Sequence, residues 1–81
     1  MKVNVQLFAA ARDAAGTKSV SVLLHNHGTV RDLRAALIQD YPQLAAWVGI
    51  ARFAVNMEYA IDDTALSLSD DVAMIPPVSG G

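Results

Sequence analysis

The chain has 81 residues, of which 53% are hydrophobic and 17% are charged, with a net charge of −2 and no cysteine. This length allows one small domain, the lack of cysteine excludes disulfides and a thiol nucleophile, and the scattered basic residues argue against nucleic-acid binding. Because the charged share falls below the usual value of about 25%, we expect an apolar surface patch that is reserved for a protein partner.

The first predicted element is a half-buried strand over residues 2–8, where apolar and polar side chains alternate. Its core-facing residues would be Val3, Val5 and Leu7. Phe8 falls on the polar side of the strand, and an aromatic side chain on a wet face is a candidate partner contact. The alternative is that the strand twists near its end and places Phe8 in the core.

Residues 9–15 allow a short helical turn that Gly16 would end as a left-handed C-cap. Residues 19–24 alternate again, which predicts a second strand antiparallel to the first. His25 and His27 follow in a loop, but two histidines without a third ligand nearby do not predict a metal site.

The clearest helix covers residues 29–41, because its apolar residues recur at helical spacing. Thr29 and Asp32 have the spacing of a capping box at its start, and Pro42 ends it. A second short helical turn is expected within residues 43–49, with Trp47 covering one end of the core.

Three short strands complete the predicted sheet, over residues 53–55, 59–61 and 72–75. Asn56 suits the turn after the third strand because it tolerates positive φ. Residues 72–75 are apolar without alternation, which indicates a strand covered on both faces. One cover would be the long helix, and the other would be a partner that Met74 or Ile75 faces. The element order predicts an α+β fold in which one main helix lies across a mixed sheet.

Two acidic pairs interrupt the second half of the chain. Asp62 and Asp63 invite an acid/base interpretation, but neighbouring carboxylates in a loop are more often turn and cap residues. Asp70 and Asp71 are expected at a turn before the last strand.

The chain ends in Ile-Pro-Pro-Val-Ser-Gly-Gly, so we expect a domain over residues 1–75 and a flexible tail over 76–81. Pro76 and Pro77 favour an extended backbone that leads the tail away from the domain. Glycine has no Cβ, so Gly80 and Gly81 could enter a slot too narrow for other residues and present a terminal carboxylate there. The alternative is an ordinary disordered chain end.

Three blocks of sequence are similar to the ubiquitin-like sulfur-carrier family, which includes the small subunit of molybdopterin synthase. They are Leu7-Phe8-Ala9-Ala10-Ala11-Arg12 followed by Gly16, then Ala54-Val55-Asn56, and finally the run from Asp70 to Gly81. They occur in the family's order and cover the whole chain. Ser69 departs from the pattern, because relatives usually have glycine there, and this puts the local turn geometry in question.

The resemblance implies a β-grasp fold, as in ubiquitin, with the first and last strands adjacent and parallel. It also implies that a partner adenylating enzyme uses ATP to activate Gly81 and that a sulfur donor protein converts the carboxylate to a thiocarboxylate. The sulfur would then pass, within a heterotetramer formed with the large synthase subunit, to cyclic pyranopterin monophosphate. Such a chain is a carrier, without catalytic activity alone and without a tightly bound cofactor.

The resemblance also assigns roles to individual residues. Gly81 would carry the sulfur, and the tail threaded into a partner would comprise Pro76, Pro77, Val78, Ser79 and Gly80. The resemblance favours Phe8, Arg12 and Tyr59 as partner contacts, and Met74 and Ile75 join them because of the apolar last strand. Other functions stay open: a sulfur carrier for thiamine thiazole synthesis, a ubiquitin-like protein modifier, or an interaction module whose tail has no role.

The sequence contains no apolar run near the roughly 20 residues that span a bilayer. Its N-terminus does not resemble a signal peptide. We therefore expect no membrane association and a cytoplasmic location.

Overall fold

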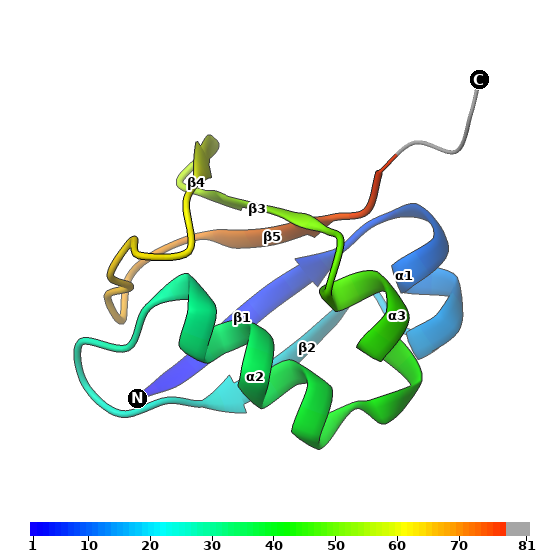
Figure 1. Cartoon of the computed structure of the whole chain (residues 1–81), viewed down its shortest axis with the longest axis horizontal. Helices are drawn as coiled ribbons and strands as arrows, with labels where there is room; N and C mark the ends of the chain where they lie inside the picture. Colours follow the sequence, from blue (N-terminus) through cyan, green and yellow to red (C-terminus); the bar gives the residue numbers. More distant parts are fainter. Residues whose placement is uncertain (78–81) are drawn as a thin grey trace.

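The computed structural model describes residues 1–77 as one mixed sheet with helices packed against it (Figure 1). The strands are β1 (Lys2–Leu7), β2 (Ser19–Leu23), β3 (Arg52–Val55), β4 (Glu58–Ala60) and β5 (Val72–Ile75). The helices are α1 (Ala9–Ala15), α2 (Val30–Asp40) and α3 (Ala45–Val48), with a 3₁₀ turn, η1 (Pro42–Leu44), before α3.

The strands are arranged in the order β2-β1-β5-β3-β4. Strand β1 pairs antiparallel with β2 and parallel with β5, while β3 pairs antiparallel with both β5 and β4. The first and last strands therefore lie side by side at the centre of the sheet. This confirms the predicted α+β, β-grasp architecture.

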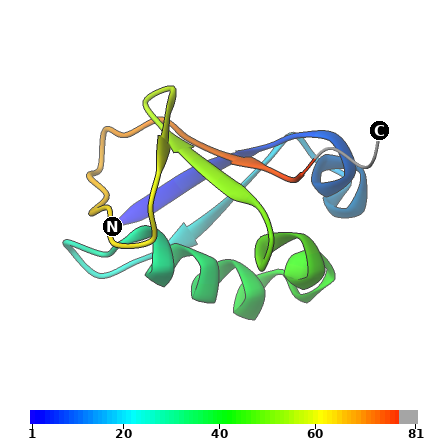
Figure 2. The ribbon, with the colours of Figure 1, turned by 45° about the horizontal axis from the view of Figure 1, so that its top comes forward.

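Helix α2 lies along one face of the sheet, as the view in Figure 2 shows. It begins at a complete capping box, in which Thr29 and Asp32 each accept a hydrogen bond from the other's backbone N–H. Its stripe of Val30, Leu33 and Leu37 is fully buried. The predicted helix and its cap are thus confirmed, and the apolar stripe belongs to the core.

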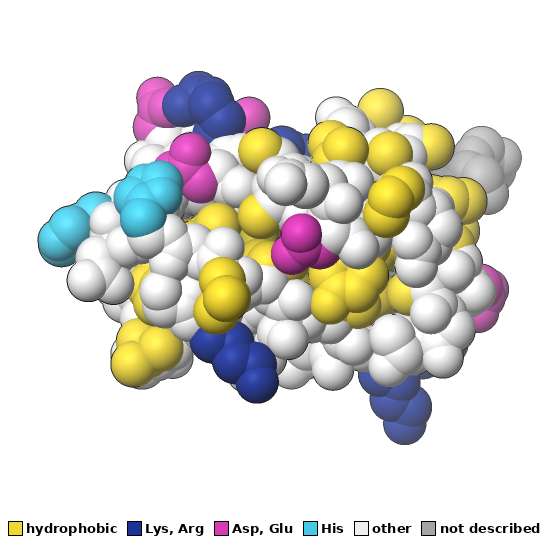
Figure 3. All heavy atoms as spheres, turned by 90° about the horizontal axis from the view of Figure 1, so that it is seen from below, with side chains coloured by type: hydrophobic (Ala, Val, Ile, Leu, Met, Phe, Trp, Pro, Cys, Tyr) yellow, Lys and Arg dark blue, Asp and Glu magenta, His cyan; other side chains and the backbone are white. Residues whose placement is uncertain are grey.

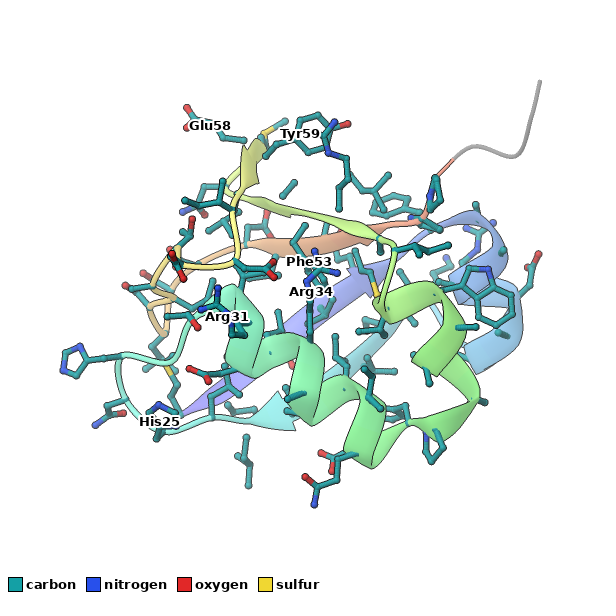
Figure 4. The ribbon with its side chains drawn as sticks, in the orientation of Figure 1. His25, Arg31, Arg34, Phe53, Glu58 and Tyr59 are labelled. Atoms are coloured by element: carbon teal, nitrogen blue, oxygen red, sulfur yellow. The ribbon has the colours of Figure 1, made fainter. Side chains whose placement is uncertain are left out.

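The core lies between α2 and the inward-facing side chains of the strands. Alternate residues of β1 are buried, and Phe53 and Met74 are the corresponding buried residues of β3 and β5. Arg34 of α2 lies over the Phe53 ring at 4.8 Å, and its Nε donates to Asp62 at 3.0 Å (Figure 4). This arginine therefore joins the helix to the segment that follows β4.

The helix side of the molecule exposes apolar side chains only in separate patches between polar atoms (Figure 3). The two histidines, His25 and His27, project together at one end of this face. Leu44, which follows α2, is fully buried, and Trp47 packs against the core from α3 as predicted.

Turns between the elements follow local backbone rules. Gly16 ends α1 with φ of +71°, as predicted for a left-handed C-cap. The β3–β4 hairpin turns through Asn56 and Met57, both at positive φ, which is the geometry of a type I′ turn. Ser69 is not among the residues at positive φ, so this turn does not require the glycine that relatives usually have there.

Candidate functional site

The outer face of the sheet, away from α2, has small side chains in its middle and large ones on both sides. Side chains alternate between the two faces of a strand, so Ala54 of β3 and Ala73 of β5 point outward, between buried neighbours. These two alanines are direct partners in the register of β3 and β5. Together they form a low floor in the middle of the sheet.

Two walls rise beside this floor. Tyr59 lies opposite Ala54 on β4 and is 62% exposed, and Figure 4 shows it on the side of the sheet away from α2. On the other side is Phe8, which comes directly after β1 and is 43% exposed. Ile75, two residues after Ala73 on β5, stands at one end of the floor. We call the resulting groove the trough.

The trough has a volume of about 440 Å³. Its lining is mostly apolar. The lining residues come from strands β1, β3, β4 and β5 and from positions directly next to these strands. The lining residues are Gln6, Phe8, Ala54, Met57, Tyr59, Asp71, Val72, Ala73 and Ile75.

Met57 closes the trough at the hairpin end. It is 94% exposed and has φ of +70°, a left-handed conformation that costs a residue with a Cβ free energy. The preceding Asn56 donates from its side-chain amide to Asp70 and accepts from the backbone N–H of Asp71, both at 2.9 Å. These bonds attach the hairpin to the start of β5, so the strained turn is held in place beside the floor.

A cation lies beside the other end of the trough, outside the residues that line it. Arg52 is the register partner of Ile75, and its guanidinium lies 4.3 Å from the centroid of the Tyr59 ring. The pair is exposed on the outer face. A guanidinium over an aromatic face is attracted by the ring's electron density, which restricts the arginine to few rotamers.

The clusters of titratable residues that could suggest a metal site or acid/base chemistry have structural explanations. Within residues 1–77, no three residues among histidine, cysteine, aspartate and glutamate come close enough to hold a metal ion. The acidic pair Asp62 and Asp63 binds Arg34 and Arg31 at 3.0 Å and 2.6 Å, in agreement with a structural role. The trough itself has a mostly apolar lining, which suits a docking surface for another protein.

The titratable groups with perturbed pKa values lie at the α2 end of the molecule, away from the trough. The backbone N–H of Thr29 donates to Asp32 and lowers the pKa of its carboxyl group, with a smaller contribution from His25 at 3.6 Å. The side-chain hydrogen bond from Arg31 to Asp63 raises the pKa of that arginine. In both cases the hydrogen bond favours the charged form of the side chain. The charged Asp32 caps α2, and the charged Arg31 connects α2 to the loop after β4.

The structure brings three of the predicted partner contacts together, because Phe8, Tyr59 and Ile75 all line the trough. Arg12 is exposed on α1 and does not line it. The prediction that Met74 faces a partner is wrong, since its side chain is 0% exposed in the core. An all-apolar strand gives no alternation from which its two faces can be distinguished.

The predicted tail begins later than expected. Pro76 is buried and so belongs to the domain, whereas Pro77 is exposed. Val78, Ser79, Gly80 and Gly81 lie outside the described residues. The last described residues follow β5 directly, so the described part of the chain ends next to the Phe8 and Ile75 end of the trough.

Sequence reasoning missed the floor of the trough, its hairpin end and the β1 residue beside the floor. These residues are Ala54 and Ala73, Met57 and Asp71, and Gln6. Alanine in a strand gives no distinctive signal. The two alanines could have been found by extending the alternation of β3 and β5 outward from the buried Phe53 and Met74.

Within the described residues, no helix has the length and apolar character required to cross a membrane. Several named proteins are similar to this chain in sequence. The molybdopterin synthase sulfur carrier subunit of Chlamydomonas reinhardtii is 37% identical, with 100% of both chains covered.

Solved structures agree with this similarity. SAMP1 from Haloferax volcanii is 30% identical with a TM-score of 0.88, covering 100% of both chains. One chain in the structure of the complex of subunits 1 and 2 of molybdopterin-converting factor from Helicobacter pylori is 26% identical to this chain. Its TM-score is 0.70, and 100% of both chains is covered. A family model described as the ThiS family matches residues 5–81. The chain therefore belongs to the ThiS family.

Proposed function

We propose that this chain is the sulfur carrier subunit of molybdopterin synthase. The observation that carries the proposal is its similarity, over 100% of both chains, to a relative with that name. The trough supports it, because it is an apolar surface next to the point where the chain leaves the domain. A large subunit seated in the trough would receive the tail that follows Pro77.

In this proposal the carboxylate of Gly81 is the functional group. One of its oxygens attacks the α-phosphate of ATP in an adenylating enzyme, and pyrophosphate leaves. The terminal sulfur of a donor persulfide then attacks the carbonyl carbon and displaces AMP. Reduction of the resulting acyl disulfide by a thiol releases a thiocarboxylate, so the chain itself gains one sulfur in place of one oxygen.

The remaining steps take place in the partners. The large subunit would bind the thiocarboxylate tail and transfer its sulfur to cyclic pyranopterin monophosphate. The absence of cysteine agrees with this division of labour, since the chain has no thiol that could carry the sulfur instead. We propose a cytoplasmic location for these steps.

Reconstitution with the large subunit tests the proposal. The thiocarboxylate form of this chain, the large subunit from the same genome and cyclic pyranopterin monophosphate should yield molybdopterin. The carboxylate form and the Gly81 deletion should yield none. Molybdopterin formation with the deletion variant would contradict the proposed role of Gly81.

A second candidate function is supported by the similarity to SAMP1, which belongs to the small archaeal modifier proteins. A modifier would form an isopeptide bond between its terminal carboxylate and a lysine of a target. Cell extracts would then contain larger conjugates of this chain that resist reducing agents.

A sulfur carrier for thiamine thiazole synthesis would differ from both candidates. Deletion of its gene would leave molybdopterin synthesis intact.

A further inference from the structure

Opposite charges lie at the two ends of the trough, although only the acidic residue belongs to its lining. Arg52 lies at the end where the chain leaves the domain, opposite Ile75 in the sheet register. Asp71 lines the other end, directly before Val72. The register of β3 and β5 runs from the Arg52–Ile75 pair to the Val55–Val72 pair, so these charges are separated by the length of the paired region.

Arg52 differs from the two arginines of α2. Three ion pairs occur among residues 1–77; Arg31 and Arg34 each take part in one, and Arg52 takes part in none. One face of its guanidinium is instead covered by the Tyr59 ring at 4.3 Å. Stacking covers a face of the group and not its N–H edge, and that edge is the part that binds a carboxylate through two parallel hydrogen bonds.

We propose that the stacked Arg52–Tyr59 pair is a specificity element of the trough that binds an aspartate or glutamate side chain of the docked large subunit. This inference rests on the proposed function. The arginine is already oriented by the ring, so little further rotamer freedom is lost when the carboxylate binds. Docking also covers the pair with apolar surface, which strengthens the charge interaction by excluding water.

The opposite charge at the far end of the trough adds a directional effect. A partner acid placed at the Asp71 end would be repelled, whereas at the Arg52 end it would be attracted. When the partner's aspartate or glutamate binds Arg52, that carboxylate lies next to Ile75 and therefore close to the start of the tail. The charge pattern thus favours the docking direction in which the partner's pocket can receive the residues that follow Pro77.

The test measures the dissociation constant of the large subunit from the same genome for wild type, Arg52→Gln and Lys18→Gln. We expect Arg52→Gln to raise the dissociation constant about tenfold, as for the loss of one charged partner in an interface. Lys18→Gln removes the same charge from an exposed residue that, unlike Arg52, does not stack on Tyr59, and it should change the dissociation constant less than about twofold. Arg52→Lys should fall between wild type and Arg52→Gln, because an ammonium group keeps the charge but lacks the planar edge.

A charge-reversal experiment identifies the partner group. Arg52→Glu is combined with single Asp or Glu to Arg changes on the large subunit, and one such combination should recover at least fivefold of the lost affinity. Equal effects of Arg52→Gln and Lys18→Gln would overturn the inference. An effect of Arg52→Gln without any coupled carboxylate on the large subunit would also overturn it, since Arg52 would then act within its own chain.

The failure of this inference and the failure of the proposed function give different results. If wild type does not bind the large subunit at all, the proposed function fails and the inference fails with it. If wild type binds and yields molybdopterin while Arg52→Gln binds equally well, only the inference fails. Thermal unfolding of each variant checks that the exposed substitutions leave the fold unchanged.

Discussion

Ala54 and Ala73 are direct partners across β3 and β5, and both face away from α2. Their small side chains keep the middle of the outer sheet surface low between Tyr59 and Phe8. The trough therefore exists because two neighbouring strands both place alanine at the same level of the sheet. A larger side chain at either position would fill it.

Filling the floor should block docking without damaging the fold. Ala73→Leu adds a branched side chain to the outer face, where the trough provides open space. We expect the dissociation constant of the large subunit to rise at least tenfold, while the melting temperature changes by only a few degrees. Isothermal titration and thermal unfolding measure the two effects. Ala73→Ser is the matched control, and its docking should be close to that of wild type; equal docking of Ala73→Leu would show that partners do not enter the trough.

A charge at Phe8 should affect binding more than stability. This side chain is 43% exposed at the wall of the trough, so Phe8→Glu places a carboxylate against the docked partner and little of it in the core. We expect a loss of affinity of tenfold or more and a loss of stability of about 1 kcal/mol or less. Leu23→Glu introduces the same charge at an exposed apolar residue of β2 that does not line the trough. A larger change in stability than in binding for Phe8→Glu would mean that Phe8 acts mainly in folding.

Replacing Met57 with glycine should raise the stability of the chain but lower its affinity for the large subunit. Its φ of +70° is strained for methionine and unstrained for glycine, so Met57→Gly should stabilise the hairpin by about 0.5 to 1 kcal/mol. The same change removes a side chain that lines the trough, so affinity for the large subunit should fall. Denaturant unfolding and titration provide the two readouts. Met57→Ala removes the thioether but keeps the strain, and it should weaken docking without the gain in stability.

The cap of α2 should make part of the stability depend on pH. The pKa of Asp32 is lowered in the folded chain, chiefly by the backbone N–H of Thr29. Its contribution is therefore present above the unfolded pKa of about 4 and is lost as the pH falls through the folded value. Asp32→Asn should be less stable than wild type at pH 7, and this difference should shrink toward pH 3. Asp13→Asn, at an exposed acid of α1, is the control; a difference for Asp32→Asn that does not change with pH would contradict the charge-based cap.

Much of the fold was predictable because several sequence signals are local and strong. Alternation defined β1 and β2, the Thr29 and Asp32 spacing defined the start of α2, and Gly16 defined the end of α1. The parallel pairing of β1 and β5 is a long-range contact that no local pattern specifies. That prediction came from the family resemblance and is confirmed by the register.

The site was predictable only in part. Phe8 could be identified because a large aromatic residue on a polar face is unusual, and Tyr59 came from the resemblance. The trough floor could not, because Ala54 and Ala73 are unremarkable until the strand register places them together. Met74 was assigned to the wrong face and Pro76 to the tail, because burial of an apolar run depends on tertiary packing. The positive φ of Met57 was also invisible, since a methionine gives no signal for a left-handed conformation.

The most direct test of the account is the intact mass of this chain after incubation with its adenylating enzyme, ATP and a persulfide sulfur donor. The account predicts a mass gain that corresponds to sulfur replacing one oxygen, and it predicts no gain without ATP or in the Gly81 deletion. Fragmentation should place the added mass on Gly81. An unchanged mass, with the same enzyme shown to be active on another carrier, would contradict the proposal that this chain carries sulfur at its C-terminal glycine.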